Sequence, residues 1–182
     1  MGNFGNRCRW FDTLLPSEER AEWISDMNTV LYFSTRGTVY ETRAYTKADI
    51  DLLIQGHQLH CLTSTDRQFD FWFSPSRPGC QSRVNERATE LFLATTTFTA
   101  KSVPLLPGAI VVATHDADGD LDGLSWEQLD LLVRRNRTVT DRDLRVLGRR
   151  IERHDRRQAR RPRTAAIKAV PAPTANRLKV AL

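Results

Sequence analysis

Arginine is the residue type whose number and spacing could support chemistry in this sequence. From Arg134 to Leu182 there are 16 Lys or Arg residues against four Asp or Glu residues, a net charge of +12. Such a segment binds a phosphate backbone through counterion release, whatever the nucleotide sequence. We therefore expect contact with nucleic acid through a set of arginines: Arg134, Arg135, Arg145, Arg149, Arg150, Arg153, Arg156, Arg157, Arg160 and Arg161.

Part of this set recurs every three or four residues, which places it on one side of a helix. Arg145, Arg149, Arg153 and Arg156 would form a ridge opposite or beside an apolar stripe of Leu144, Leu147 and Ile151. No helix-turn-helix, RNA-recognition or zinc-finger signature indicates that bases are read. The interpretation that follows is backbone contact without sequence specificity.

Three other interpretations of the basic segment stay open. The arginines could be a solvated helix face followed by a flexible tail, or they could attract a host protein with an acidic surface. The first 133 residues carry 11 basic and 18 acidic residues, so the acidic part could also bind the basic helix within the chain or in a second copy. For a protein partner, Trp10 and Trp72 are the candidate interface anchors.

The acidic turn from Asp116 to Asp122 contains the alternating aspartates that open a calcium loop. Such a loop needs an acid at its twelfth position and a glycine at its sixth. Counted from Asp118, the twelfth residue is Leu129; counted from Asp116, it is Glu127, but the sixth is Leu121. Since neither register fits, we expect a solvated turn and no metal.

The remaining candidate groups show no catalytic spacing. Neither a nucleophile elbow nor a dinucleotide or Walker glycine loop is present. The histidines lack a metal-ligand pattern: His57, His60, His115 and His154. The cysteines are odd in number and have no close pairing: Cys8, Cys61 and Cys80. We expect a non-enzymatic binding protein without a cofactor.

Hydrophobic periodicity predicts the elements that must position these residues. The pattern is typical of an α+β domain over residues 13–136, with a small mixed sheet of about five strands and helices mainly on one face. Strands are expected over 29–34, 38–45, 58–63, 68–74 and 109–114, the last one central because it is continuously apolar. Helices are expected over 17–27, 47–55 and 140–157, and after Asn85 and Ser125.

Capping residues mark several of these helix starts. Thr46 and Thr140 are each followed by Asp three residues later, which is the form of a capping box. Asn85 is expected to cap its own helix, although a ligand phosphate beside the helix N–H groups is an alternative. In the strand from Gln68 to Ser74, three phenylalanines should share one face, with Asp70 and Trp72 on the other.

The domain is flanked by segments of different composition. Residues 1–12 read as an arm, 137–159 as a basic C-terminal helix, and 160–182 as a disordered tail rich in Pro, Ala and Arg. No apolar run approaches the roughly 20 residues that span a bilayer. The N-terminus also lacks the apolar stretch of a signal peptide, so we expect a cytoplasmic protein without membrane contact.

Three motifs in this order resemble a family of bacterial, phage and mobile-element proteins known as domain of unknown function 3846. They are the helix end around Gly56, the segment from Val84 to Thr89, and the Leu106–Val112 strand. The resemblance covers residues 38–133, and the loop from Pro75 to Gln81 departs from it by its length and prolines. It implies an accessory protein of phage or mobile-element type but no defined activity.

Overall fold

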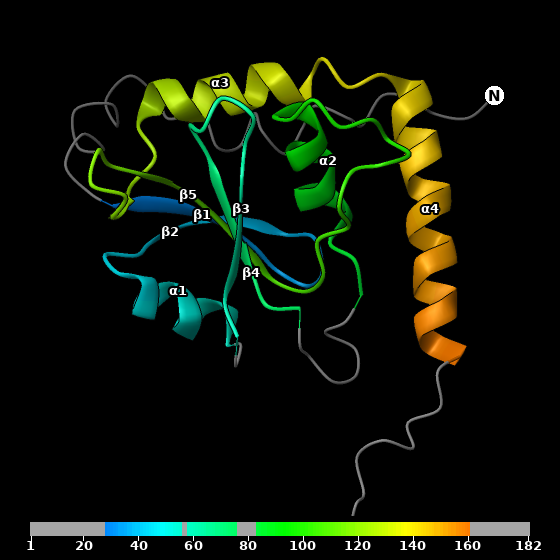
Figure 1. The fold of residues 1–182 in the computed structure, drawn as a ribbon, viewed down its shortest axis with the longest axis horizontal. Helices are drawn as coiled ribbons and strands as arrows, with labels where there is room; N and C mark the ends of the chain where they lie inside the picture. The colour runs from blue at the N-terminus through cyan, green and yellow to red at the C-terminus, as the bar shows by residue number, and fades with distance from the viewer. Residues whose placement is uncertain (1–27, 56–57, 76–82, 161–182) are drawn as a thin grey trace, which may run out of the picture.

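The computed structural model describes residues 28–55, 58–75 and 83–160. The expected α+β fold is confirmed: an antiparallel sheet carries helices on both faces, mainly on one (Figure 1). The expected arm, the helix over 17–27 and the tail from 161 lie outside the described residues, as do Trp10 and Arg161. None of the described helices is both long and apolar enough to cross a bilayer.

Six strands form the sheet, one more than expected, and every pairing is antiparallel rather than mixed. The order is β2-β1-β5-β4-β3, with β6 paired to β5. β5 is central and buried along nearly its whole length, as its apolar run predicts. The strands are β1 Thr29–Phe33, β2 Val39–Arg43, β3 His60–Thr63, β4 Asp70–Phe73, β5 Ile110–His115 and β6 Leu121–Asp122.

Strand alternation divides the core into two clusters, one on each face of the sheet. Phe69 and Phe71 pack on the first face, which is covered by α2 Glu86–Ala94, α3 Trp126–Asn136 and α4 Asp141–Arg160. Among the described helices, α1 Lys47–Ile54 covers the second face, through Ile50 and Ile54. Figure 1 shows α1 on the side of the sheet opposite to α2 and α3.

Asn85 caps α2, as predicted, and also makes hydrogen bonds to two other parts of the chain. Its Oδ1 accepts a hydrogen bond from the Ala88 amide at 3.2 Å, while its Nδ2 donates to the carbonyls of Ser34 and Gly108, each at 3.0 Å. The residue is only 3% exposed. Asn85 therefore ties the start of α2 to the chain beside β1 and β5, and its polar groups are engaged within the protein.

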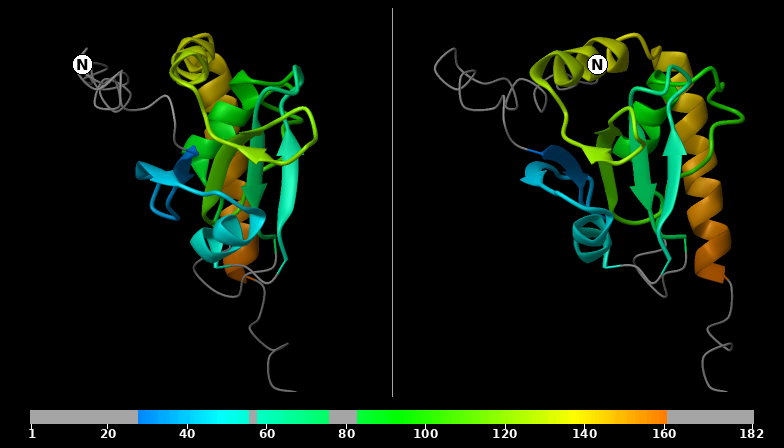
Figure 2. Two further views of the ribbon diagram at one scale, coloured as in Figure 1. Left: turned by 90° about the vertical axis from the view of Figure 1, so that its left-hand side faces the viewer. Right: turned by 60° about the vertical axis from the view of Figure 1, so that its left-hand side comes forward.

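α4 is a straight rod that stands at one end of the molecule, beside α2 (Figures 1 and 2). Its inner side buries Leu147 and Ile151 in the main core. Near its end, Asp155 accepts a hydrogen bond from the Val84 amide at 3.3 Å and lies 3.8 Å from the Arg83 guanidinium. These contacts fix which side of α4 faces solvent. The helix extends to Arg160, three residues beyond the expected end.

Candidate nucleic-acid interface

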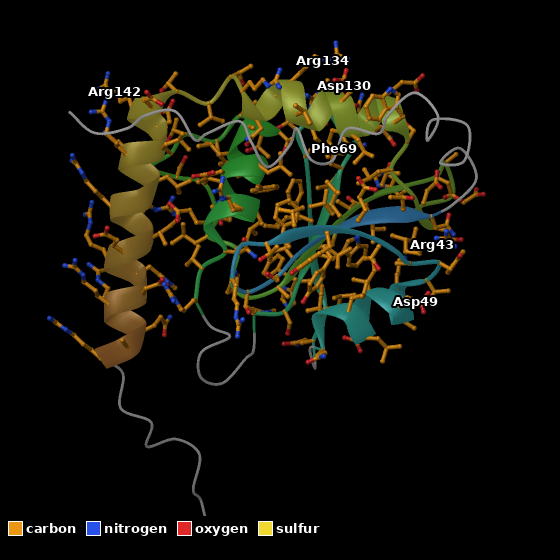
Figure 3. All side chains as sticks on the ribbon, turned by 180° about the vertical axis from the view of Figure 1, so that it is seen from behind. Arg43, Asp49, Phe69, Asp130, Arg134 and Arg142 are labelled. Atoms are coloured by element: carbon orange, nitrogen blue, oxygen red, sulfur yellow. The ribbon has the colours of Figure 1, made fainter. Side chains whose placement is uncertain are left out.

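The outer side of α4 carries the predicted arginine ridge. Arg145, Arg149, Arg153 and Arg156, called the outer ridge below, are all exposed, whereas Leu147 on the inner side is buried. Figure 3 shows nitrogen-tipped side chains along the side of α4 that faces away from the body. Three more predicted contacts are exposed or half-buried on the same helix: Arg150, Arg157 and Arg160.

Local hydrogen bonds orient two ridge arginines along the helix. Nε of Arg145 donates to the Asp141 carbonyl at 3.2 Å, and Nε of Arg153 donates to the Arg149 carbonyl at 3.1 Å. Each bond uses one of the five N–H donors of a guanidinium, so the terminal nitrogens stay available to a ligand. Arg156 lies 3.4 Å from Glu152, an exposed ion pair worth less than about 1 kcal/mol.

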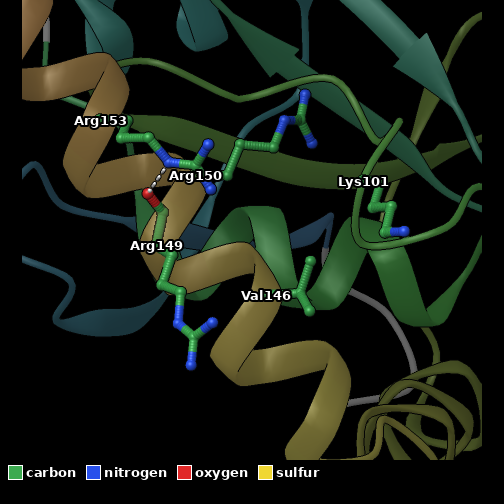
Figure 4. Close-up of a pocket in the computed structure, with 5 residues that line it drawn as sticks. All are labelled: Lys101, Val146, Arg149, Arg150 and Arg153. Carbon is green, nitrogen blue, oxygen red and sulfur yellow. Dashed lines mark hydrogen bonds between the residues drawn. The ribbon is translucent and has the colours of Figure 1, made fainter.

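A cavity of about 420 Å³ opens beside the outer ridge, between α4 and the turn that follows α2 (Figure 4). Nη1 of Arg150 donates to the Ala100 carbonyl on that turn at 3.3 Å, which fixes the guanidinium in place. The cavity, called the α4 pocket below, is lined by one apolar and four cationic side chains: Lys101, Val146, Arg149, Arg150 and Arg153. Sequence analysis missed Lys101, because nothing in its local pattern places it beside α4.

The two predicted contacts on α3 are engaged elsewhere. Arg134 pairs with Asp130 one turn earlier (Figure 3). Arg135 pairs with Asp66 in the β3–β4 turn, and its guanidinium lies 5.7 Å from the centre of the Phe69 ring. Its side chain is 27% exposed. Arg135 thus fastens α3 to the sheet, and the structure does not bring it together with the outer ridge.

The pairing with Arg135 affects the pKa of the Asp66 carboxyl. Burial raises its pKa, but hydrogen bonds from Arg135, Ser64 and the Gln68 amide favour the charged form and outweigh burial. The net result is a pKa below the usual carboxyl range. The ion pair between Asp66 and Arg135 is therefore intact at neutral pH.

Trp72 lies on β4 within the cluster covered by α1 and is half-buried. Its ring is part of the core of this face, and its buried Nε1 has no hydrogen-bond partner among the described residues. Its role as an interface anchor stays a prediction. The described surface exposes four other large aromatic side chains: Tyr40, Tyr45, Phe98 and Trp126.

A second polar group, missed in the sequence, lies on the α1 side of the sheet. Asp70 is 5% exposed and accepts hydrogen bonds from Thr63 Oγ1 at 2.6 Å and His115 Nδ1 at 2.7 Å. Desolvation and the Asp70 charge raise the pKa of the nearby Cys61 thiol to about 12. We call Thr63, Asp70, His115 and Cys61 the Asp70 cluster. Its carboxylate is engaged by neighbours, and the Cys61 thiol, although exposed, has a raised pKa that disfavours the reactive thiolate.

The acidic turn between β5 and β6 satisfies its own backbone. Asp116 Oδ1 accepts hydrogen bonds from the amides of Asp118 and Asp120, at 3.0 and 2.9 Å. Over residues 28–55, 58–75 and 83–160, no group of three His, Cys, Asp or Glu side chains is arranged to hold a metal ion. The turn thus has the geometry of a hydrogen-bonded loop.

No family model, curated protein or solved structure matches this chain. The resemblance to the family of unknown function remains a prediction. The argument for function therefore rests on the geometry of α4 and its surroundings.

Proposed function

We propose that this protein acts by binding nucleic acid, and that the outer ridge of α4 contacts the phosphate backbone. The observation that carries the proposal is the difference between the two sides of α4. The inner side packs against the core and makes the Asp155 contacts with Val84 and Arg83. The outer side presents a row of guanidinium groups to solvent. Because the inner side of α4 is fixed against the core, the arginines on its outer side are already positioned before a ligand binds.

The dimensions of α4 suit several phosphates at once. A helix of 20 residues is about 30 Å long, and duplex DNA carries one charge per about 1.7 Å of axis. The outer ridge repeats about once per turn, so successive guanidinium groups can reach successive phosphates along a strand. Contact with six phosphates would reduce affinity about a thousandfold between 50 and 200 mM salt.

The test compares two triple variants that remove the same charge. R145Q/R156Q/R157Q changes α4 outside the pocket, and R36Q/R43Q/K47Q changes exposed positions around β2 and α1. Fluorescence anisotropy with labelled duplex and single-stranded DNA and RNA gives the affinity over a salt series. We expect the α4 variant to lose at least tenfold in affinity and about three in the logarithmic salt slope. The control should change little.

Equal losses in both variants would mean that net charge, and not α4, determines binding. If the wild type binds none of the four nucleic acids at 50 mM salt, a protein with an acidic surface becomes the better candidate partner. Deleting α4 would be a poorer test, because it would strip Leu147 and Ile151 from the core. A cytoplasmic location and a phage or mobile-element origin remain expectations from the sequence.

A further inference from the structure

The α4 pocket has four cationic side chains, whereas a backbone phosphate carries one negative charge. Among the residues that the structure describes, the lining of the pocket has these four cationic side chains and no carboxylate. Among the described residues, the Lys101 ammonium and the Arg149 guanidinium make no hydrogen bond or ion pair, although the Arg149 carbonyl accepts a hydrogen bond from Arg153. Like charges around one cavity repel one another, and an anion with more than one negative charge would relieve this repulsion.

The donors of the pocket come from two elements, α4 and the turn after α2. Arg150 is held on the Ala100 carbonyl and Arg153 on the Arg149 carbonyl, so both guanidinium groups are fixed while most of their N–H donors remain unused. Lys101 adds an ammonium from the turn after α2, across from the helix (Figure 4). Fixed guanidinium donors bind phosphate oxygens strongly.

Nucleic acids contain two kinds of phosphate, the backbone diester and the terminal monoester, and their charge and shape indicate which one fits the α4 pocket. A backbone phosphodiester has one charge, two free oxygens and a chain that continues on both sides. A terminal phosphate monoester has three free oxygens, a charge of about −1.5 to −2 at pH 7, and a chain on one side only. The pocket is one concave site with room for a phosphate and its sugar, and Val146 offers an apolar surface to that sugar.

We propose that the α4 pocket binds the terminal phosphate monoester of a nucleic-acid strand while the ridge arginines outside the pocket, Arg145 and Arg156, hold the adjoining backbone. The assignment rests on the proposed function and adds a preference for phosphorylated strand ends. The backbone alone is bound by exposed arginines spaced along the helix. The end is bound by Lys101, Arg149, Arg150 and Arg153 together.

The experiment measures the affinity of the full chain for one 20-nucleotide single strand in three forms: with a 5′-phosphate, with a 3′-phosphate, and with hydroxyl groups at both ends. At 150 mM salt and pH 7.5 we expect about tenfold tighter binding of a phosphorylated form. K101Q/R149Q should abolish this preference, because both side chains are exposed lining residues. The matched control R43Q/K47Q should keep it. Thermal melts confirm that each variant folds.

The pH gives a second readout that a merely structural effect would not produce. The second ionisation of a phosphate monoester has a pKa near 6, whereas a diester has none in this range. The preference should therefore shrink between pH 7.5 and 5.5, while binding of the strand with hydroxyl ends changes much less.

Equal binding of the three forms by the wild type, or a preference that survives K101Q/R149Q, would overturn the assignment. In either case the nucleic-acid affinity of R145Q/R156Q/R157Q still tests the outer ridge. The proposed function is therefore tested independently of the assignment of the pocket. Displacement of the phosphorylated strand by a nucleoside monophosphate at micromolar concentration would show that the pocket takes free nucleotides, and it would overturn the assignment to strand ends.

Discussion

The Asp70 cluster and the α4 pocket are both groups of charged or polar side chains, and they differ in how their charges are balanced. In the Asp70 cluster, the buried carboxylate has hydrogen bonds from Thr63 and His115. In the α4 pocket, four cations line one cavity, with no carboxylate among its described lining residues. The first group is complete within the protein, whereas the second gains stability when an external anion binds.

This difference shows why residue type alone is a poor guide to a site. Cysteine, histidine and aspartate together can support nucleophilic catalysis, but here the Asp70 charge acts on the Cys61 thiol itself and helps to raise its pKa. A carboxylate next to a thiol disfavours the thiolate. Arginine and lysine rarely do chemistry, but unpaired and fixed around a cavity they form a ready anion site.

The largest expected effect is on the reactivity of Cys61. A thiol with a pKa of about 12 is almost wholly protonated at pH 8, and its higher intrinsic nucleophilicity offsets this only in part. In a C8S/C80S background, Cys61 should react with iodoacetamide about a hundredfold more slowly than a free cysteine. Mass spectrometry of the alkylated protein follows the reaction.

D70N should speed this alkylation, because it removes the second-largest cause of the raised pKa. The same protein unfolded in urea should react at the ordinary rate. Rapid alkylation of folded Cys61 at pH 7 would contradict the view that the Asp70 cluster is complete within the protein, since the cluster would then contain an activated nucleophile.

A second prediction separates the two groups by stability. D70A should reduce the free energy of unfolding by about 2 kcal/mol, because Thr63 and His115 lose a buried partner. K101A should change it by less than about 0.5 kcal/mol, since Lys101 is an exposed side chain. Urea unfolding followed by circular dichroism measures both. A comparable loss in K101A would mean that the α4 pocket is part of the fold and not a free anion site.

The sequence predicted those features of the fold that depend on neighbouring residues. The phenylalanine face of β4, the apolar centre of the sheet in β5 and the caps at Asn85 and Ser125 were all expected. Each follows from a period of two or 3.6, or from a side chain that bonds its own backbone. The outer ridge was predicted for the same reason, since arginines three and four apart must share one side of a helix.

What the sequence could not supply was tertiary proximity. Lys101 joins the α4 pocket only because α2 and α4 pack together, and no local period encodes that packing. Arg135 has the sequence surroundings of a phosphate contact, but the β3–β4 turn brings Asp66 to it. Trp72 alternates onto the predicted face, yet the α1-side cluster packs against it.

The smallest expected effect concerns the ion pair between Arg135 and Asp66. The Asp66 pKa is lowered in the folded protein, so its contribution is complete above the unfolded value near 3.8 and is lost as pH falls through the folded value. At pH 7, D66N should lower the free energy of unfolding by about 1 kcal/mol, a modest value because the carboxylate is part exposed. Urea unfolding at pH 7 and pH 3 measures the difference between D66N and the wild type.

That difference should shrink at pH 3, because this pH lies below the unfolded value near 3.8, so the unfolded wild type binds a proton and the contribution of Asp66 to stability declines. D51N, which changes an exposed carboxylate on α1, serves as the control and should have little effect at either pH. D66N also frees Arg135 beside Phe69 without adding or removing an arginine. If D66N bound nucleic acid much more tightly than removal of one negative charge explains, Arg135 would belong to the interface after all, and its pairing with Asp66 would restrain it.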